Sequence, residues 1–228
     1  MLLTSSSRRP DIDINELQDA RSVCILSGVL VCAPVFVEAP LVRTMPVLSL
    51  FSTIILLLLS YYLLKNPRTK VWGDLLRGFS YSWLAGAIYW GWFRHEPLIH
   101  IPIESLCLPF VIYALSRGKH QIGGLFYLGS LVGTIITDIY FYLTGLIPYW
   151  RQIMAAEDGS LIASVLHKAL AQIQNPWGIS WAFVLVSVLL SLGLYALRQQ
   201  KLHWWSFAGA ILSTILVDGL FGVAAYLV

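Results

Sequence analysis

Residues 122–147 read IGGLFYLGSLVGTIITDIYFYLTGLI, and residues 206–227 read SFAGAILSTILVDGLFGVAAYL. Each run is long enough to cross a bilayer, because a membrane-spanning helix needs about 20 apolar residues. Both runs carry the pattern Gly-x3-small-Thr-x3-Asp, formed by Gly129, Gly133, Thr134 and Asp138 and again by Gly209, Ser213, Thr214 and Asp218. A membrane-buried carboxyl costs several kcal/mol unless it is paired or hydrated, so both Asp residues are candidate functional positions.

The composition places the whole chain in a membrane. Of its 228 residues, 57% are hydrophobic and 12% are charged, whereas a soluble domain has roughly 25% charged residues. We therefore expect an all-α, polytopic integral membrane protein, with a polar segment at residues 1–21 followed by a single transmembrane domain at 22–228. The net charge of +3 is small and no basic stripe is present, so nucleic acid is not an expected partner.

Apolar runs predict a bundle of about seven membrane-spanning helices. The expected spans are residues 22–39, 46–64, 76–93, 101–116, 122–147, 178–197 and 206–227. Pro34 and Pro109 fall inside two of these spans, where proline is expected to kink a helix.

The long connection at 148–177 carries apolar residues at helical spacing between Leu161 and Ile173. Asp158-Gly159-Ser160 supplies residues typical of a helix start, and Asn175-Pro176 supplies a stop. Two interpretations remain open, an amphipathic helix on the membrane surface and a lid packed on the bundle.

The two Asp-containing runs align at an offset of about 80 residues, with Tyr113-Ala114-Leu115 and Tyr195-Ala196-Leu197 in the preceding spans. This pattern predicts a parallel duplication of a helical hairpin, against the alternative of chance similarity in apolar sequence. Gly129, Gly133, Gly209 and Ser213 are expected to pack helices closely. Asp138 and Asp218, with Thr134 and Thr214, either stabilise these contacts or line a ligand or proton path.

A second polar cluster, His95, Glu96, His100 and Glu104, lies between the third and fourth spans. A metal site is not expected, because the chain lacks HExxH, a second His pair and Cys ligands nearby. Glu104 is the most informative member, since it lies about one turn inside the fourth span and is expected to point toward the depth of Asp138 and Asp218.

Two resemblances bear on function. Trp72-Gly73-Asp74-Leu75-Leu76-Arg77-Gly78, His100-Ile101-Pro102-Ile103-Glu104 and Asp218 resemble a family of cyanobacterial integral membrane proteins of unknown function, which implies a plasma or thylakoid membrane of a photosynthetic prokaryote. Pro102-Ile103-Glu104-Ser105 is similar to the Pro-x-Glu-Glu segment of the small membrane-embedded lycopene cyclases, which implies Glu104 as a catalytic proton donor to a polyene. The chain departs from that segment at Ser105 and has no second copy of it.

Three functions follow as hypotheses. The leading one is a non-enzymatic protein that binds a lipophilic small molecule or a membrane-complex partner, or assists assembly. The second is a small transporter that uses buried Asp138 and Asp218, and the third is an enzyme that acts on a carotenoid or prenyl chain through Glu104. The sequence names no ligand, substrate or cofactor.

The distribution of basic residues predicts the orientation. Eleven Lys and Arg residues fall on the side of the N-terminus and four on the other, which by the positive-inside rule places the N-terminus in the cytoplasm and the C-terminus on the opposite side. A reporter enzyme that is active only outside the cytoplasm is expected to be active when fused after Val228. The same reporter fused in the loop at residues 65–69 should be inactive, and the reverse result would contradict this topology.

Overall fold

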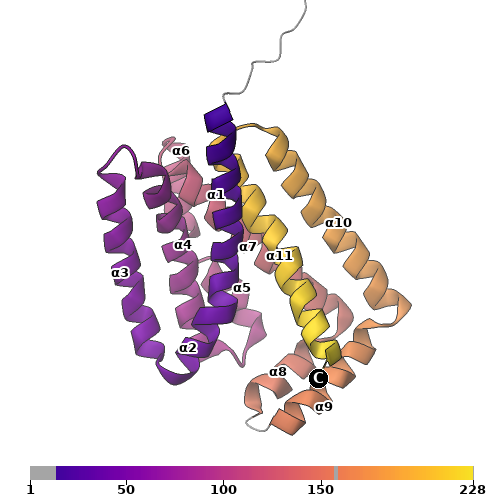
Figure 1. The fold of residues 1–228 in the computed structure, drawn as a ribbon. Helices are drawn as coiled ribbons and strands as arrows, with labels where there is room; N and C mark the ends of the chain where they lie inside the picture. Colours follow the sequence, from indigo (N-terminus) through magenta and orange to yellow (C-terminus); the bar gives the residue numbers. More distant parts are fainter. Residues whose placement is uncertain (1–13, 157–158, 228) are drawn as a thin grey trace, which may run out of the picture.

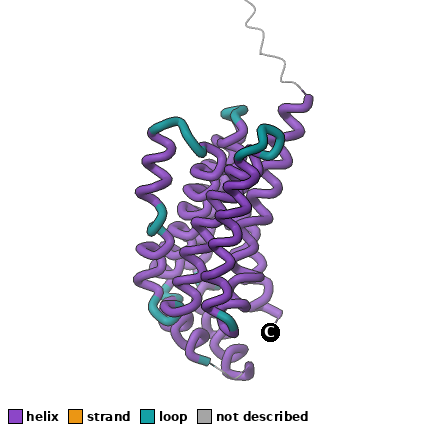
Figure 2. Tube along the Cα trace, turned by 90° about the vertical axis from the view of Figure 1, so that its left-hand side faces the viewer, coloured by secondary structure: helices purple, strands orange, loops and turns teal. Residues whose placement is uncertain are grey.

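The computed structural model describes residues 14–156 and 159–227, and every regular element in these ranges is a helix. The helices run alongside one another between two ends where the loops gather (Figure 2). Helix α1 begins at one end, and α11 finishes at the other (Figure 1). The expected all-α membrane bundle is confirmed.

The first half of the chain contains three long helices and several short ones. The elements are α1 (Ile14–Ala33), η1 (Pro34–Glu38), α2 (Ala39–Thr44), α3 (Pro46–Leu64), α4 (Lys70–Ile88), η2 (Tyr89–Phe93), η3 (Pro97–Ile99), α5 (His100–Glu104) and α6 (Leu108–Ser116). The second half contains α7 (Gln121–Thr144), α8 (Ile147–Ala155), α9 (Gly159–Ile173), α10 (Pro176–Arg198) and α11 (Leu202–Leu227).

Six helical segments of the described chain are long and apolar enough to cross a membrane, one fewer than the sequence predicts. The segment at 76–93 is the one that differs, because it falls in α4 and η2. Helix α4 carries Lys70, Asp74 and Arg77, and it lies inside the bundle against α3 and α7. It still runs the length of the bundle (Figure 1), with Asp74 buried, Arg77 partly buried and Lys70 exposed at its start.

The fourth expected span, 101–116, is also not one continuous α-helix. A turn at Ser105–Cys107 separates α5 from α6, and Pro109 occupies the first turn of α6, where a missing N–H is tolerated. In the first span, Pro34 begins the π-helix η1. Both prolines therefore mark departures from regular α-helix, as the sequence predicts.

The connection after α7 folds into two helices that lie at the end of the bundle opposite the start of α1 (Figure 1). Helix α9 contacts α10 and α11, and the Gln172 side chain donates to the Thr144 carbonyl at 3.1 Å. These contacts favour the lid interpretation. Asn175 and Pro176 follow α9, and they also start α10. The Asn175 side chain caps α10 by accepting a hydrogen bond from the Gly178 amide at 2.8 Å. Asp158 lies outside the described residues.

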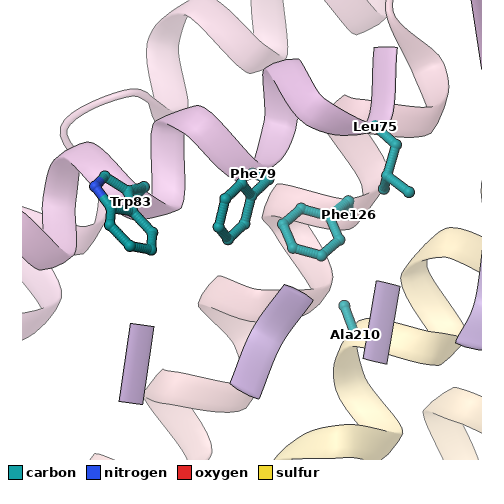
Figure 3. Close-up of a cluster of buried hydrophobic side chains, with 5 residues drawn as sticks. All are labelled: Leu75, Phe79, Trp83, Phe126 and Ala210. Atoms are coloured by element: carbon teal, nitrogen blue, oxygen red, sulfur yellow. The ribbon is translucent and has the colours of Figure 1, made fainter. Parts of the chain in front are cut away.

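The apolar core lies between α4, α7 and α11. Leu75, Phe79 and Trp83 on α4 meet Phe126 on α7 and Ala210 on α11 (Figure 3). The indole N–H of Trp83 also donates to the Ser52 hydroxyl of α3 at 2.8 Å. Buried serines and small residues fill the contacts between helices, while large apolar side chains such as Ile55 and Phe183 face outward. That arrangement suits a protein whose solvent is lipid.

Helices α7 and α11 pack in parallel. The Ser206 hydroxyl donates to the Ile122 carbonyl at 2.8 Å near the start of both helices, and Thr137 donates to Asp218 at 2.8 Å further along both. Gly133 lies against the Thr214 side chain, so any side chain there would overlap it. The duplication of the helical hairpin stays a prediction.

Helices α7 and α1 also approach α11 closely. Gly129 faces the Phe207 carbonyl and the Ala210 side chain, and Gly209 faces the Cys24 carbonyl of α1. Ser213 lies against Gly28 of α1 in the same contact. The four residues proposed for helix packing thus all lie where α11 meets a neighbour.

Gly209→Leu is expected to destabilise the bundle, because its side chain has no space beside the α1 backbone. Overpacking of this kind costs about 1–3 kcal/mol. Gly219→Leu is the matched control on the same helix, since no atom lies within 4 Å of a side chain added there. Thermal unfolding in detergent should show a lower midpoint for Gly209→Leu only. Equal midpoints for the two variants would contradict the close contact.

Candidate functional site

His100 lies at the centre of a buried polar network. Its Nδ1 atom is 3.1 Å from both carboxylate oxygens of Asp138, and its Nε2 atom is 3.8 Å from Oε1 of Glu104. The side chains of His100, Asp138 and Glu104 are 17%, 13% and 12% exposed. A single imidazole therefore links two carboxylates that come from different helices.

Short helix α5 places His100 and Glu104 together. The two residues are four apart, so their side chains project from the same face of the helix. Helix α5 ends at Glu104, and the hydroxyl of buried Tyr127 on α7 donates to the Glu104 carbonyl at 2.5 Å. Because α7 also carries Asp138, one helix holds both ends of α5.

An aromatic side chain covers one face of the imidazole. The ring of Tyr89, which is 1% exposed, stacks on His100 with centroids 4.0 Å apart. Trp90 packs against Trp150 of α8, whose indole N–H donates to the Arg94 carbonyl at 3.0 Å. Helix α8 thus closes this end of the bundle over the network.

The cluster of His95, Glu96, His100 and Glu104 expected from the sequence is divided between two environments. Glu96 pairs with Arg151 of α8 at 2.7 Å on the exposed surface, while His100 and Glu104 point into the bundle. Among the described residues, no group of three or more His, Cys, Asp and Glu side chains is arranged to hold a metal ion.

Glu38 is a buried carboxyl that our sequence reasoning missed. It is fully buried at the end of η1, where Oε1 accepts a hydrogen bond from Ser49 at 2.9 Å and Oε2 has no partner among the described atoms. Gly86 on α4 leaves the space that Oε2 occupies. The available signal was that Glu38 is the only acidic residue in the first apolar span.

Glu38 and Tyr89 both lie in π-helical segments, η1 and η2, which contact α4 and α2 near this end of the bundle. π-Helical turns are rare, and they occur frequently at functional sites. One of these segments carries the buried carboxyl of Glu38, and the other carries the ring that stacks on His100.

The two Asp residues of the repeated pattern have different partners. Asp138 faces His100 of α5, whereas Oδ2 of Asp218 accepts from the Thr137 hydroxyl. Thr214 is buried against Gly133, and Thr134 is partly buried on α7. The sequence pattern pairs each Asp with a Thr four residues earlier, but the threonine that binds Asp218 is Thr137.

A separate ionic network, also missed in the sequence, lies at the opposite end of α7. Asp74 of α4 accepts from His120 Nδ1 at 2.8 Å and from the amides of Ile122 and Gly123 at 3.0 and 3.4 Å. Arg77 donates to His120 Nε2 at 2.7 Å. A guanidinium can only donate, so the imidazole proton lies on Nδ1. This carboxylate caps the start of α7, which is a structural role.

Comparison with known families identifies the chain. A family described as "Protein of unknown function (DUF3120)" matches residues 27–226, so the chain belongs to that family. No curated protein matches the chain, and no solved structure matches it. The chain is therefore an integral membrane protein whose specific activity is unknown, and the case for function rests on the geometry of its buried network.

The contact between His100 and Asp138 is expected to contribute coupling energy. Hydrogen bonds to charged groups contribute about 1.5–3 kcal/mol, so a double-mutant cycle of His100→Gln and Asp138→Asn should give a coupling of that order. The measurement is reversible unfolding in mixed micelles.

A control cycle pairs Asp138→Asn with Asp74→Asn. These residues lie near opposite ends of α7, roughly 20 Å apart at a rise of about 1.5 Å per residue, and their effects should add to within about 0.5 kcal/mol. Additive behaviour in both cycles would contradict the contact.

Proposed function

We propose that this protein is a small proton-dependent transporter, in which Asp138, His100 and Glu104 form a buried path for protons. The observation that carries the proposal is the single imidazole between two carboxylates inside the bundle. Chains of Asp, Glu and His within membrane-spanning segments are typical of proton relays.

The imidazole suits this role chemically. Histidine can accept a proton on one ring nitrogen and release one from the other, and it changes charge near neutral pH. Nδ1 faces Asp138 and Nε2 faces Glu104. A proton that enters from Asp138 can therefore leave to Glu104 once the ring is protonated and the 3.8 Å separation between Nε2 and Oε1 shortens to a hydrogen bond.

The charge of the region favours a cation. Glu38, Glu104, Asp138 and Asp218 are four carboxyls toward this end of the bundle, and the basic groups described inside it are His100 and the partly buried Arg94. Buried carboxyls select for cations in membrane pathways. We therefore propose that the transported species is the proton itself or a small cation exchanged against protons.

A second candidate is the non-enzymatic binding of a lipophilic ligand or a partner helix. It is favoured by an open, largely apolar surface on the outer face of α10, formed by Phe183, Val184, Ser187, Val188, Ser191 and Leu192. The hydroxyls of Ser187 and Ser191 bond to the carbonyls four residues earlier, which leaves an apolar surface. In that case the buried network would stabilise the fold only.

Proton flux into proteoliposomes tests the first candidate. With a pH-sensitive dye inside and an imposed pH gradient, the wild-type protein should collapse the gradient faster than protein-free vesicles do. Asp138→Asn and His100→Gln are each expected to slow this flux by roughly tenfold or more, because a relay loses a proton-transfer group.

Glu96→Gln is the matched control, since it removes a carboxyl at the same end of the bundle that pairs with exposed Arg151. It should conduct at the wild-type rate. A wild-type protein that conducts no faster than empty vesicles would contradict the transporter. If Asp138→Asn elutes as a folded species and conducts normally, the proposed path is wrong.

A further inference from the structure

A hollow of about 330 Å³ lies at the turn between α6 and α7, lined by Tyr113, Ala114, Arg117, Lys119 and His120. Binding sites for small ligands have volumes of about 300–1,000 Å³, so this hollow is large enough for a small polar group. It is at the opposite end of α7 from Asp138 and plays no part in the proton path proposed above.

The lining of the hollow is strongly basic. Arg117 and Lys119 are exposed, and a third positive charge comes from Arg77, whose guanidinium binds Nε2 of His120 at 2.7 Å. The carboxylate of Asp74, on the other side of His120, is buried and is occupied by His120 Nδ1 and the first amides of α7. The field in the hollow therefore favours an anion.

The turn that forms the hollow has a defined shape. Gly118 and His120 both adopt left-handed conformations, with φ of 65° and 53°. The Lys119 amide donates to the Ala114 carbonyl at 2.9 Å, and the Arg117 guanidinium lies 5.4 Å from the centroid of the Tyr113 ring. The Asp74–His120 contact anchors the far side of the turn to α4. The basic groups are thus positioned around one space.

An apolar surface leads away from the hollow along α6. Phe110, Ile112 and Tyr113 are exposed on this short helix, by 69%, 55% and 64%. Such a surface faces lipid tails in a membrane-spanning segment, so the hollow lies where headgroups meet acyl chains. The distribution of Lys and Arg in the sequence also predicts that this end faces the cytoplasm, where anionic lipids attract basic clusters.

We propose that the hollow binds the phosphate of an anionic phospholipid, with Arg117 and Lys119 on the headgroup and an acyl chain along α6. Arginine and lysine are the side chains that bind phosphate oxygens most strongly. The lipid is favoured over free phosphate because the apolar face of α6 continues directly from the basic residues. The proposal does not depend on proton transport.

The test compares two double variants of the full-length protein that each lose two positive charges. Arg117→Gln with Lys119→Gln removes the basic lining, and Lys65→Gln with Arg68→Gln removes two charges from the α3–α4 turn. Both turns lie at the end of the bundle where α4 and α7 begin, and both substitutions are at exposed positions that should leave the fold intact.

Binding is measured in neutral detergent by native mass spectrometry, with phosphatidylglycerol and phosphatidylcholine as the two probes. The wild-type protein should retain phosphatidylglycerol preferentially. Each basic residue near a membrane surface contributes about 1 kcal/mol, so the first double variant should weaken this binding by roughly five- to thirtyfold. The second should weaken it by less than about twofold if only the hollow binds the lipid.

Three outcomes would overturn the proposal. Equal losses in the two double variants would assign the effect to net charge. Equal retention of both lipids would exclude recognition of an anionic headgroup. Displacement of phosphatidylglycerol by millimolar inorganic phosphate would identify soluble phosphate as the occupant instead of a lipid.

Discussion

The close packing of α7 against its neighbours is the constraint on which the rest of the structure depends. Gly123 on α7 meets Gly78 on α4 backbone to backbone, and Gly133 leaves room for Thr214 of α11. In lipid, helices associate through such contacts because no hydrophobic difference drives them together. Once α7 is held between α4 and α11, another part of its surface faces α5. Asp138 and Tyr127 on that surface bind the two ends of α5, the short helix that carries His100 and Glu104.

The two His–Asp contacts of this protein illustrate how the same residue types serve different purposes. Asp74 is satisfied by His120 and by two amides at the start of α7, and His120 is satisfied in turn by Arg77. At that end of the bundle, the positive charge of Arg77 offsets the negative charge of Asp74, and both side chains have hydrogen-bond partners. At the other end of the bundle, Asp138 and Glu104 share one imidazole, and Glu38 keeps an oxygen without a described partner. A buried region with more carboxyls than partners is costly in a membrane, and this cost is the ground for the functional role that we propose for it.

Much of the fold follows from the sequence, because apolar runs in a membrane protein have few alternatives to helix. The sequence did not reveal that α4 lies inside the bundle, since Asp74 and Arg77 are both partnered by His120, some 45 residues away. The candidate site was only partly predictable for the same reason. Glu104, Asp138 and Asp218 stand out as charges in apolar runs, but the contact of His100 with Asp138 joins residues 38 positions apart. Nothing local in the sequence specifies that contact, or the burial of Glu38 beside Ser49.

The register between α7 and α11 explains why two similar sequence patterns behave differently. The patterns align at an offset of 80 residues, whereas the contact between the helices joins Thr137 to Asp218 at an offset of 81. One residue turns a helix by about 100°, so when Thr137 faces α11, Asp138 must face away from it, toward α5. Thr137, which binds Asp218, is therefore adjacent in the sequence to Asp138, which binds His100.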